Sequence, residues 1–205
     1  MSVRARVVVM ASGSGSNLQA LIEASAAGTL PADVVAVICD RADAYALTRA
    51  DHVGITARLV ARVPGEPRAE YDTRLASAVR SYEPDYIVLA GWMRLLTMSF
   101  LAHFPHRVVN LHPARPGELP GTHAIERAFD EARAGRRTST GVMVHLVPGE
   151  GVDDGPVLAT VDVPIEPDDT LDTLAERVHA AEHAVLVQAL ADLCHGTTAP
   201  NVTRS

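Results

Sequence analysis

This sequence has few cysteines, few aromatic residues and no long N-terminal apolar run, and each of these features narrows the class of protein. Its 205 residues include two cysteines, Cys39 and Cys194, which are far apart and form no CxxC motif; this argues against a zinc finger and suits a reducing compartment. Aromatic residues make up 4% of the chain and hydrophobic residues 47%, so we expect an aliphatic core. The N-terminal apolar stretch Val7–Met10 is too short for a signal peptide or a membrane span.

An excess of positive charge is also missing. The formal net charge is −7, so the chain lacks the basic surface that nucleic acid or an anionic membrane would require. An anionic small molecule would have to be held by local main-chain amides and a few arginines. We expect a cytoplasmic protein with a single domain over residues 1–205, whose tail, residues 196–205, carries no pattern and is mobile.

Strand and helix patterns alternate through the first half of the chain. The predicted strands are Arg6–Ala11, Val34–Cys39, Ile55–Val60, Tyr86–Ala90 and Val108–His112. The predicted helices are Leu18–Ala27, Ala42–His52, Arg68–Tyr82, Ser99–Phe104, Ala124–Ala134 and a last one that opens at Thr170. This alternation predicts an α/β fold: a mainly parallel sheet flanked by helices, Rossmann-like in its first half.

Two strand-like segments in the second half should pair differently. Thr140–Val147 and Val157–Ile165 are separated by nine residues, which is too few for a crossover helix, so we predict an antiparallel pair. Ligands of mainly parallel sheets lie at the carboxyl ends of the strands. The polar segments that follow the predicted strands are therefore the candidate site.

The first of these segments is Ser12–Asn17, which reads SGSGSN between a strand and a helix. Free amides and the dipole at a helix N-terminus favour an anion, and Gly13 and Gly15 allow its close approach. No Gly-Lys-Ser/Thr follows, so this is not a Walker A loop, and Leu18 stands where a GxGxxG motif has its third glycine. A helix cap without ligand is the alternative to the phosphate site that we favour.

The second segment is Val108–Gly121, VVNLHPARPGELPG. Asn110 and His112 are two residues apart, so on a strand their side chains point to the same face. An amide beside an imidazole suits a reaction in which a carbonyl oxygen gains negative charge while a proton moves. Alternatively, these polar residues only hydrogen-bond the proline-rich loop that follows.

A carboxylate at Asp153 would complete such a site. If it lies near His112, its charge should raise the pKa of that imidazole, and an imidazolium with the Asn110 amide could then stabilise an oxyanion. The chain has no GxSxG nucleophile motif at a strand end. We therefore expect direct transfer of an acyl-type group to an amine, through a tetrahedral intermediate, rather than a covalent acyl-enzyme.

Four segments in this order resemble the phosphoribosylglycinamide formyltransferase family: SGSGSNLQAL, GWMRLL, VNLHPARPGELPGTH and GVDDGP. The resemblance runs from about Val7 to His183. It implies transfer of a formyl group from the co-substrate 10-formyltetrahydrofolate to the glycinamide amine of phosphoribosylglycinamide in purine biosynthesis, without a metal. It leaves open whether the protein is a monomer or a homodimer.

The resemblance also implies roles for individual residues. The implied catalytic residues are Asn110, His112 and Asp153. The implied substrate-binding residues are Gly15, Ser16, Asn17, His179 and Glu182. The implied folate-binding residues are Arg68, Met93, Arg94, Leu95, Leu96, Asn110, Gly149, Glu150, Gly151, Val152 and Asp153.

The chain departs from the family pattern in two loops. It has Ala114-Arg115-Pro116-Gly117 where the family usually has a Ser-Leu-Leu-Pro type run. The loop between His145 and Asp153 also looks one residue longer than the common pattern. Both departures bear on how the pterin or the substrate is seated.

Other interpretations use some of the same residues. A related formyltransferase with another acceptor, or a formyltetrahydrofolate hydrolase, would keep the chemistry. A nicotinamide-dependent oxidoreductase would use the glycine loop with Asp40 on the ribose. His179-Ala-Ala-Glu182-His183 fits the HxxEH pattern of zinc peptidases, although we favour an ordinary pair of histidines on a helix surface.

Three further residues carry predictions of their own. His123 follows the Pro120-Gly121 turn and is predicted to line the substrate side. His145, like most of the remaining histidines, is predicted to be a surface or structural residue. Trp92 is predicted to belong to the core rather than to stack on a ligand.

Overall fold

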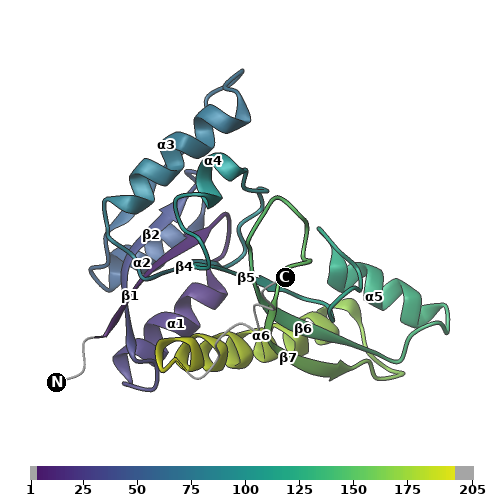
Figure 1. The fold of residues 1–205 in the computed structure, drawn as a ribbon. Helices are drawn as coiled ribbons and strands as arrows, with labels where there is room; N and C mark the ends of the chain where they lie inside the picture. Colours follow the sequence, from purple (N-terminus) through teal and green to yellow (C-terminus); the bar gives the residue numbers. More distant parts are fainter. Residues whose placement is uncertain (1–3, 197–205) are drawn as a thin grey trace, which may run out of the picture.

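One mixed sheet organises the chain in the computed structural model, which describes residues 4–196. Within these residues, seven strands lie in the order β3-β2-β1-β4-β5-β6-β7 (Figure 1). They are β1 Ala5–Ala11, β2 Ala32–Cys39, β3 Ala57–Leu59, β4 Tyr86–Leu89, β5 Val108–His112, β6 Ser139–Leu146 and β7 Val157–Pro164. The pairs from β3 to β5 are parallel, whereas β5–β6 and β6–β7 are antiparallel. The predicted fold class is confirmed, including the antiparallel pair.

Helices cover both faces of this sheet. They are α1 Ser16–Ala26, α2 Tyr45–His52, α3 Arg68–Arg80, α4 Met98–Leu101, α5 Ala124–Arg133 and α6 Leu171–Cys194. Figure 1 shows α3 and α4 on one side of β1 and β4, with α1 and α6 on the other. Within these described helices none is long and apolar enough to cross a membrane.

The alternation of side chains along β1 explains why helices are needed on both faces. Val7 and Val9 pack with α1 and α6 in one apolar cluster, whereas Val8 and Met10 pack with α3 and α4 in the other. All four are fully buried, and each such side chain stabilises the fold by about 1.5–3 kcal/mol relative to exposure. A strand that is apolar on both faces, as this one is, therefore belongs in the middle of the sheet.

Some predicted boundaries were wrong by a few residues. The helix predicted over Ala42–His52 begins at Tyr45, because Ala44 is extended, with φ −65° and ψ 117°. The strand predicted over Ile55–Val60 is shortened to β3 at the edge of the sheet. The first helix begins at Ser16, two residues earlier than predicted. Nearly all of the predicted mobile tail, residues 197–205, lies outside the described residues.

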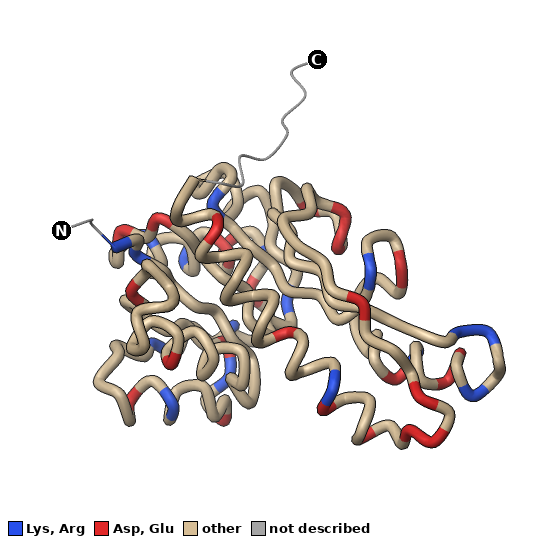
Figure 2. The backbone as a smooth tube through the Cα atoms, turned by 90° about the horizontal axis from the view of Figure 1, so that it is seen from below, with Lys and Arg blue, Asp and Glu red and all other residues tan. Residues whose placement is uncertain are grey.

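The fold brings three connections together at the carboxyl ends of the central strands. The chain leaves β1, β4 and β5 at their carboxyl ends, and these strands are neighbours in the sheet. The strand order reverses between β1 and β4, which is where open α/β sheets bind ligands. Figure 2 shows arginines and acidic residues scattered along the backbone, with arginines close together at the turn after α5.

Candidate active site

Two pockets adjoin at the carboxyl ends of β1, β4 and β5. The larger has a volume of about 680 Å³ and lies between the segment after β4, the end of β5 and the loop before β7. The smaller, of about 400 Å³, lies over the loop between β1 and α1. The residues that line both pockets are Gly91, Met93, Leu111, Pro113, His123, Ala124 and Glu126.

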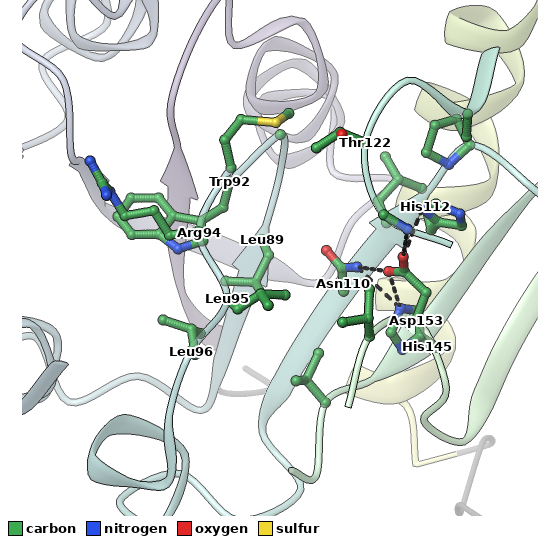
Figure 3. Close-up of a pocket in the computed structure, with 18 of the residues that line it drawn as sticks. Leu89, Trp92, Arg94, Leu95, Leu96, Asn110, His112, Thr122, His145 and Asp153 are labelled. Atoms are coloured by element: carbon green, nitrogen blue, oxygen red, sulfur yellow. Dashed lines mark hydrogen bonds and ion pairs between the residues drawn. The ribbon is translucent and has the colours of Figure 1, made fainter. Parts of the chain in front are cut away.

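The three predicted catalytic residues are in contact in the larger pocket. The Asn110 amide Nδ2 donates to Asp153 Oδ1 at 3.1 Å, and His112 Nδ1 lies 3.3 Å from Asp153 Oδ2. Figure 3 shows these side chains turned toward one another, across the pocket from Trp92 and Leu95. The structure thus joins the end of β5 to a loop more than forty positions further along the chain, as predicted.

The backbone of the loop after β5 makes further contacts with His112 and Asp153. The Leu119 carbonyl lies 3.0 Å from His112 Nε2, and the Gly121 N–H donates to Asp153 Oδ2 at 2.8 Å. Both imidazole nitrogens of His112 therefore face oxygen atoms. An imidazolium at this position would have an acceptor for each of its two N–H groups.

The pKa of His112 differs from the prediction. Burial lowers it below the ordinary value and outweighs the opposing charge of Asp153 and the Leu119 carbonyl. The prediction of a raised pKa was therefore wrong for the ligand-free pocket, because it counted the charge and left out the desolvation of a side chain that is 5% exposed. New negative charge beside the ring would offset that desolvation.

Asp153 is held as a carboxylate. Burial by itself would raise its pKa, but the His145 imidazole 3.6 Å away, the hydrogen bond from the Gly121 N–H and the charge of His112 bring it below the ordinary value. Its backbone has a φ of +54°, a conformation that L-residues adopt at a cost of about 1–3 kcal/mol. Such strain is typical of functional sites.

His145 is a site residue that the sequence interpretation did not single out. It is 2% exposed, its Nε2 lies 3.1 Å from Asn110 Nδ2 and 3.6 Å from Asp153 Oδ1, and its Nδ1 lies 2.9 Å from the Leu146 carbonyl. The β5–β6 register places His145 directly opposite Asn110. The sequence predicted both strands but contained no signal for their register.

The smaller pocket contains the predicted anion loop. Gly15 is the N-cap residue of α1, with a φ of +71°, and no side chain caps this described helix. An added Cβ at Gly15 would lie 2.9 Å from the Ala46 side chain. Glycine is therefore required both by conformation and by space, and the first-turn amides remain available to a ligand.

Side chains from α6 close the same pocket. Glu182 Oε2 accepts from Asn17 Nδ2 at 3.3 Å and lies 2.8 Å from His179 Nδ1. The hydrogen bond to Glu182 raises the pKa of His179 above its ordinary value. This places a paired imidazole and carboxylate in the same pocket as Gly15 and Ser16.

Most of the residues predicted to bind folate line the larger pocket. They are Met93, Arg94, Leu95, Leu96, Asn110, Gly149, Glu150, Gly151, Val152 and Asp153. Arg68 is the exception: it is exposed at the start of α3 and lines neither pocket. Its predicted contact with folate remains a prediction.

Asp40 and Trp92 both lie close to the larger pocket, Asp40 behind Arg94 and Trp92 in the lining itself. Asp40 accepts from Arg94 Nε at 2.5 Å and is 5% exposed, so it is not free for the ribose of a dinucleotide. Trp92 is buried in the cluster with α3 and α4, as predicted, and also lines the larger pocket. His123 lines both pockets.

The departure at Ala114–Gly117 has a structural counterpart. Arg115 Nε donates to Asp162 Oδ1 at 2.7 Å and its Nη2 donates to Ser139 Oγ at 2.8 Å, while Glu118 accepts from Arg137 at 2.5 Å. These contacts tie the loop after β5 to β6 and β7.

The HxxEH interpretation would need a metal site. Residues 4–196 contain no group of three or more His, Cys, Asp or Glu side chains that could hold a metal ion.

This arrangement defines a class of protein: an α/β group-transfer enzyme with a glycine loop at a helix N-terminus, an adjoining, largely apolar cleft and an amide–imidazole–carboxylate set in that cleft. The family model described as formyl transferase matches residues 5–190. The chain belongs to the formyl transferase family, as its motifs indicated.

Relatives and solved structures agree with this assignment. The chain is 42% identical over 198 residues to the phosphoribosylglycinamide formyltransferase of Schizosaccharomyces pombe, covering 91% of this chain and 95% of that protein. It is 37% identical to the enzyme of the same name from Escherichia coli, covering 87% and 82%. The structure of glycinamide ribonucleotide transformylase 1 from Symbiobacterium toebii has a TM-score of 0.89 and 35% identity, covering 96% of this chain and 90% of that one.

Proposed function

We propose that the protein transfers a formyl group from 10-formyltetrahydrofolate to the glycinamide amine of phosphoribosylglycinamide, a step of purine biosynthesis. The observation that carries this proposal is the set of Asn110, His112 and Asp153 in a largely apolar pocket, which adjoins the pocket of the Gly15–Asn17 loop. Relatives that are 42% and 37% identical over most of the chain bear the name of this enzyme.

The two pockets suit the two molecules differently. In the smaller pocket, Gly15–Asn17 would hold the phosphate on free main-chain amides, and His179 and Glu182 would contact the rest of the ribonucleotide. The larger pocket suits a flat heterocycle, because Leu89, Trp92 and Leu96 form apolar walls and Gly149–Asp153 borders the opening.

The three residues Asn110, His112 and Asp153 would divide the chemistry between them. 10-Formyltetrahydrofolate supplies the carbonyl carbon that the amine attacks. Protonated His112 stabilises the negative charge on the carbonyl oxygen, and its pKa rises as that charge develops. Asp153 is ionised and takes up the amine proton, directly or through one water molecule. The tetrahedral intermediate then collapses: the bond between the formyl carbon and N10 of the folate breaks, N10 takes up the proton that Asp153 received, and the formyl group remains on the substrate amine.

Asn110 must change partners to take part. Its Nδ2 lies within hydrogen-bond distance of Asp153 and His145, so both of its N–H groups are already engaged by side chains of the pocket. In the substrate complex, one of them turns to the carbonyl oxygen. The contacts seen here hold the amide in the pocket wall until then.

A spectrophotometric assay with 10-formyl-5,8-dideazafolate, run with and without phosphoribosylglycinamide, tests the proposal. Turnover that requires the ribonucleotide is expected. Turnover without it would instead indicate a hydrolase, and no turnover in either case would refute the proposed donor and acceptor pair. The His112→Ala variant should remain folded and lose most of the activity.

A further inference from the structure

The loop between Pro113 and α5 is held by an arginine that no family motif singled out. Arg127 lies in α5, half-buried, and its Nη2 donates to the Leu119 carbonyl at 2.7 Å and to the Pro120 carbonyl at 2.8 Å. Its Nε lies 3.4 Å from the carbonyl of His123. One guanidinium thus binds the main chain of three residues in this loop.

The same short stretch of backbone binds both catalytic side chains. The Leu119 carbonyl that accepts from Arg127 is also 3.0 Å from His112 Nε2. Two residues further on, the Gly121 N–H donates to Asp153 at 2.8 Å. Arg127 and His112 therefore share the Leu119 carbonyl as a hydrogen-bond partner. Two residues of main chain connect that carbonyl to the Gly121 N–H, which binds Asp153.

The conformation of this loop needs an external support. Leu119 and His123 have φ values of +46° and +59°, a region that residues with a Cβ rarely adopt. Gly117 and Gly121 also have positive φ, so the loop alternates left-handed residues. Hydrogen bonds from a charged donor are about twice as strong as neutral ones, so the guanidinium is suited to holding the carbonyls in place.

We infer that Arg127 is a positioning residue for the reaction: it fixes the Leu119–Gly121 backbone, which in turn orients His112 and Asp153. This rests on the proposed function for its chemical meaning. In the absence of the guanidinium, the Leu119 and Pro120 carbonyls lose their charged donor. The loop then samples conformations in which Leu119 no longer faces His112 and Gly121 no longer faces Asp153.

Three variants of the full chain test this. Arg127→Met keeps most of the side-chain length and removes the donors. Arg127→Lys restores a cationic nitrogen; because both strong bonds come from the single Nη2 atom, a lysine can replace much of the contact. Arg133→Met is the matched control, since Arg133 is exposed in the last turn of the same helix.

The first measurement needs no turnover: ¹⁵N chemical shifts of the His112 ring in the ligand-free protein. Arg127→Met should change the shift of His112 Nε2, because the Leu119 acceptor moves. Arg127→Lys and Arg133→Met should leave it close to the wild-type value. An unchanged Nε2 shift in Arg127→Met would overturn the inference, even if the proposed function proves wrong.

The second measurement is steady-state kinetics against pH. Arg127→Met should lower kcat about tenfold or more, as small displacements of reacting groups do, with little change in the KM of the ribonucleotide; Arg127→Lys should recover most of kcat. The acid limb of the profile should move up by about one pH unit, because loss of the Gly121 hydrogen bond raises the pKa of Asp153. An unmoved acid limb, or an equal loss in Arg133→Met, would show a merely structural role.

The two measurements also separate the two proposals. If wild-type protein shows no formyl transfer, the proposed function fails, and the ¹⁵N shifts still decide whether Arg127 orients His112. Circular dichroism of each variant checks the fold. Should Arg127→Met not fold, Arg127→Gln, whose shorter amide cannot reach the same carbonyls, replaces it in both measurements.

Discussion

Replacing Asp153 by asparagine removes one negative charge from the site, and with it the group proposed to take up the amine proton. The side chain keeps its size, and its amide oxygen can still accept from Asn110 or the Gly121 N–H. For His112, what is lost is the charge 3.3 Å from its Nδ1. Because burial already lowers the pKa of His112 against the pull of Asp153, the variant leaves that desolvation unopposed, and the pKa must fall further.

The distance sets the size of this effect. Two unit charges 3.3 Å apart attract by about 5 kcal/mol at an effective dielectric constant of about 20, and by about 1.3 kcal/mol in water. At 1.36 kcal/mol per unit, these limits correspond to a fall in the His112 pKa of about one to about four units. Above its pKa, each unit removes about 90% of the remaining imidazolium, so kcat at neutral pH should fall by at least about tenfold.

Titration of the His112 ring protons by NMR measures this directly in Asp153→Asn and in wild type. Asp154→Asn is the matched control, since Asp154 is exposed on the same loop and its removal changes the net charge equally. The pKa should fall in the first variant and stay within a few tenths of a unit in the second. A His112 pKa that is unchanged or raised in Asp153→Asn would refute the electrostatic reasoning.

Three further predictions concern the smaller pocket and the stability of the fold. Gly15→Ala should raise the KM of the ribonucleotide and lower the melting temperature, because the new Cβ would meet Ala46 at 2.9 Å; unchanged kinetics would argue against the phosphate site. The raised pKa of His179 keeps its positive charge to a higher pH, so ribonucleotide affinity should decline as pH rises through that value, and His179→Gln should abolish this dependence. Arg177→Met should cost roughly 1 kcal/mol of unfolding free energy at neutral pH, the upper range for a surface pair, since two bonds of 2.7 and 2.8 Å join the partly exposed Arg177 to the buried Asp169 carboxylate. Because the pKa of Asp169 is lowered, chiefly by Arg177, this contribution is present above the ordinary aspartate pKa and is lost as pH falls, so wild-type and variant denaturation curves should converge in acid.

Local pattern was enough to find the scaffold and the positions of its polar segments. The strand at Val108–His112 was predicted with its observed bounds, because an apolar β-branched run ends at a proline and both signals are local. The loop at Gly15 was predicted from equally local signals, since the apolar run that ends at Ala11 is followed by serine and glycine. Motif order then indicated which of these segments belong to one site, and the pockets contain nearly all of them.

Tertiary structure decided what depends on distant groups. The register between β5 and β6 places His145 opposite Asn110, and a shift by one residue would have turned it to the other face. The direction of the His112 pKa shift follows from burial by the whole molecule, which outweighs the one charge visible in the sequence. The bonds from Arg127 to Leu119 and Pro120 depend on a loop with left-handed residues. Spacing along a chain determines which face a side chain takes, whereas desolvation, strand register and loop closure are set by atoms that are remote in sequence.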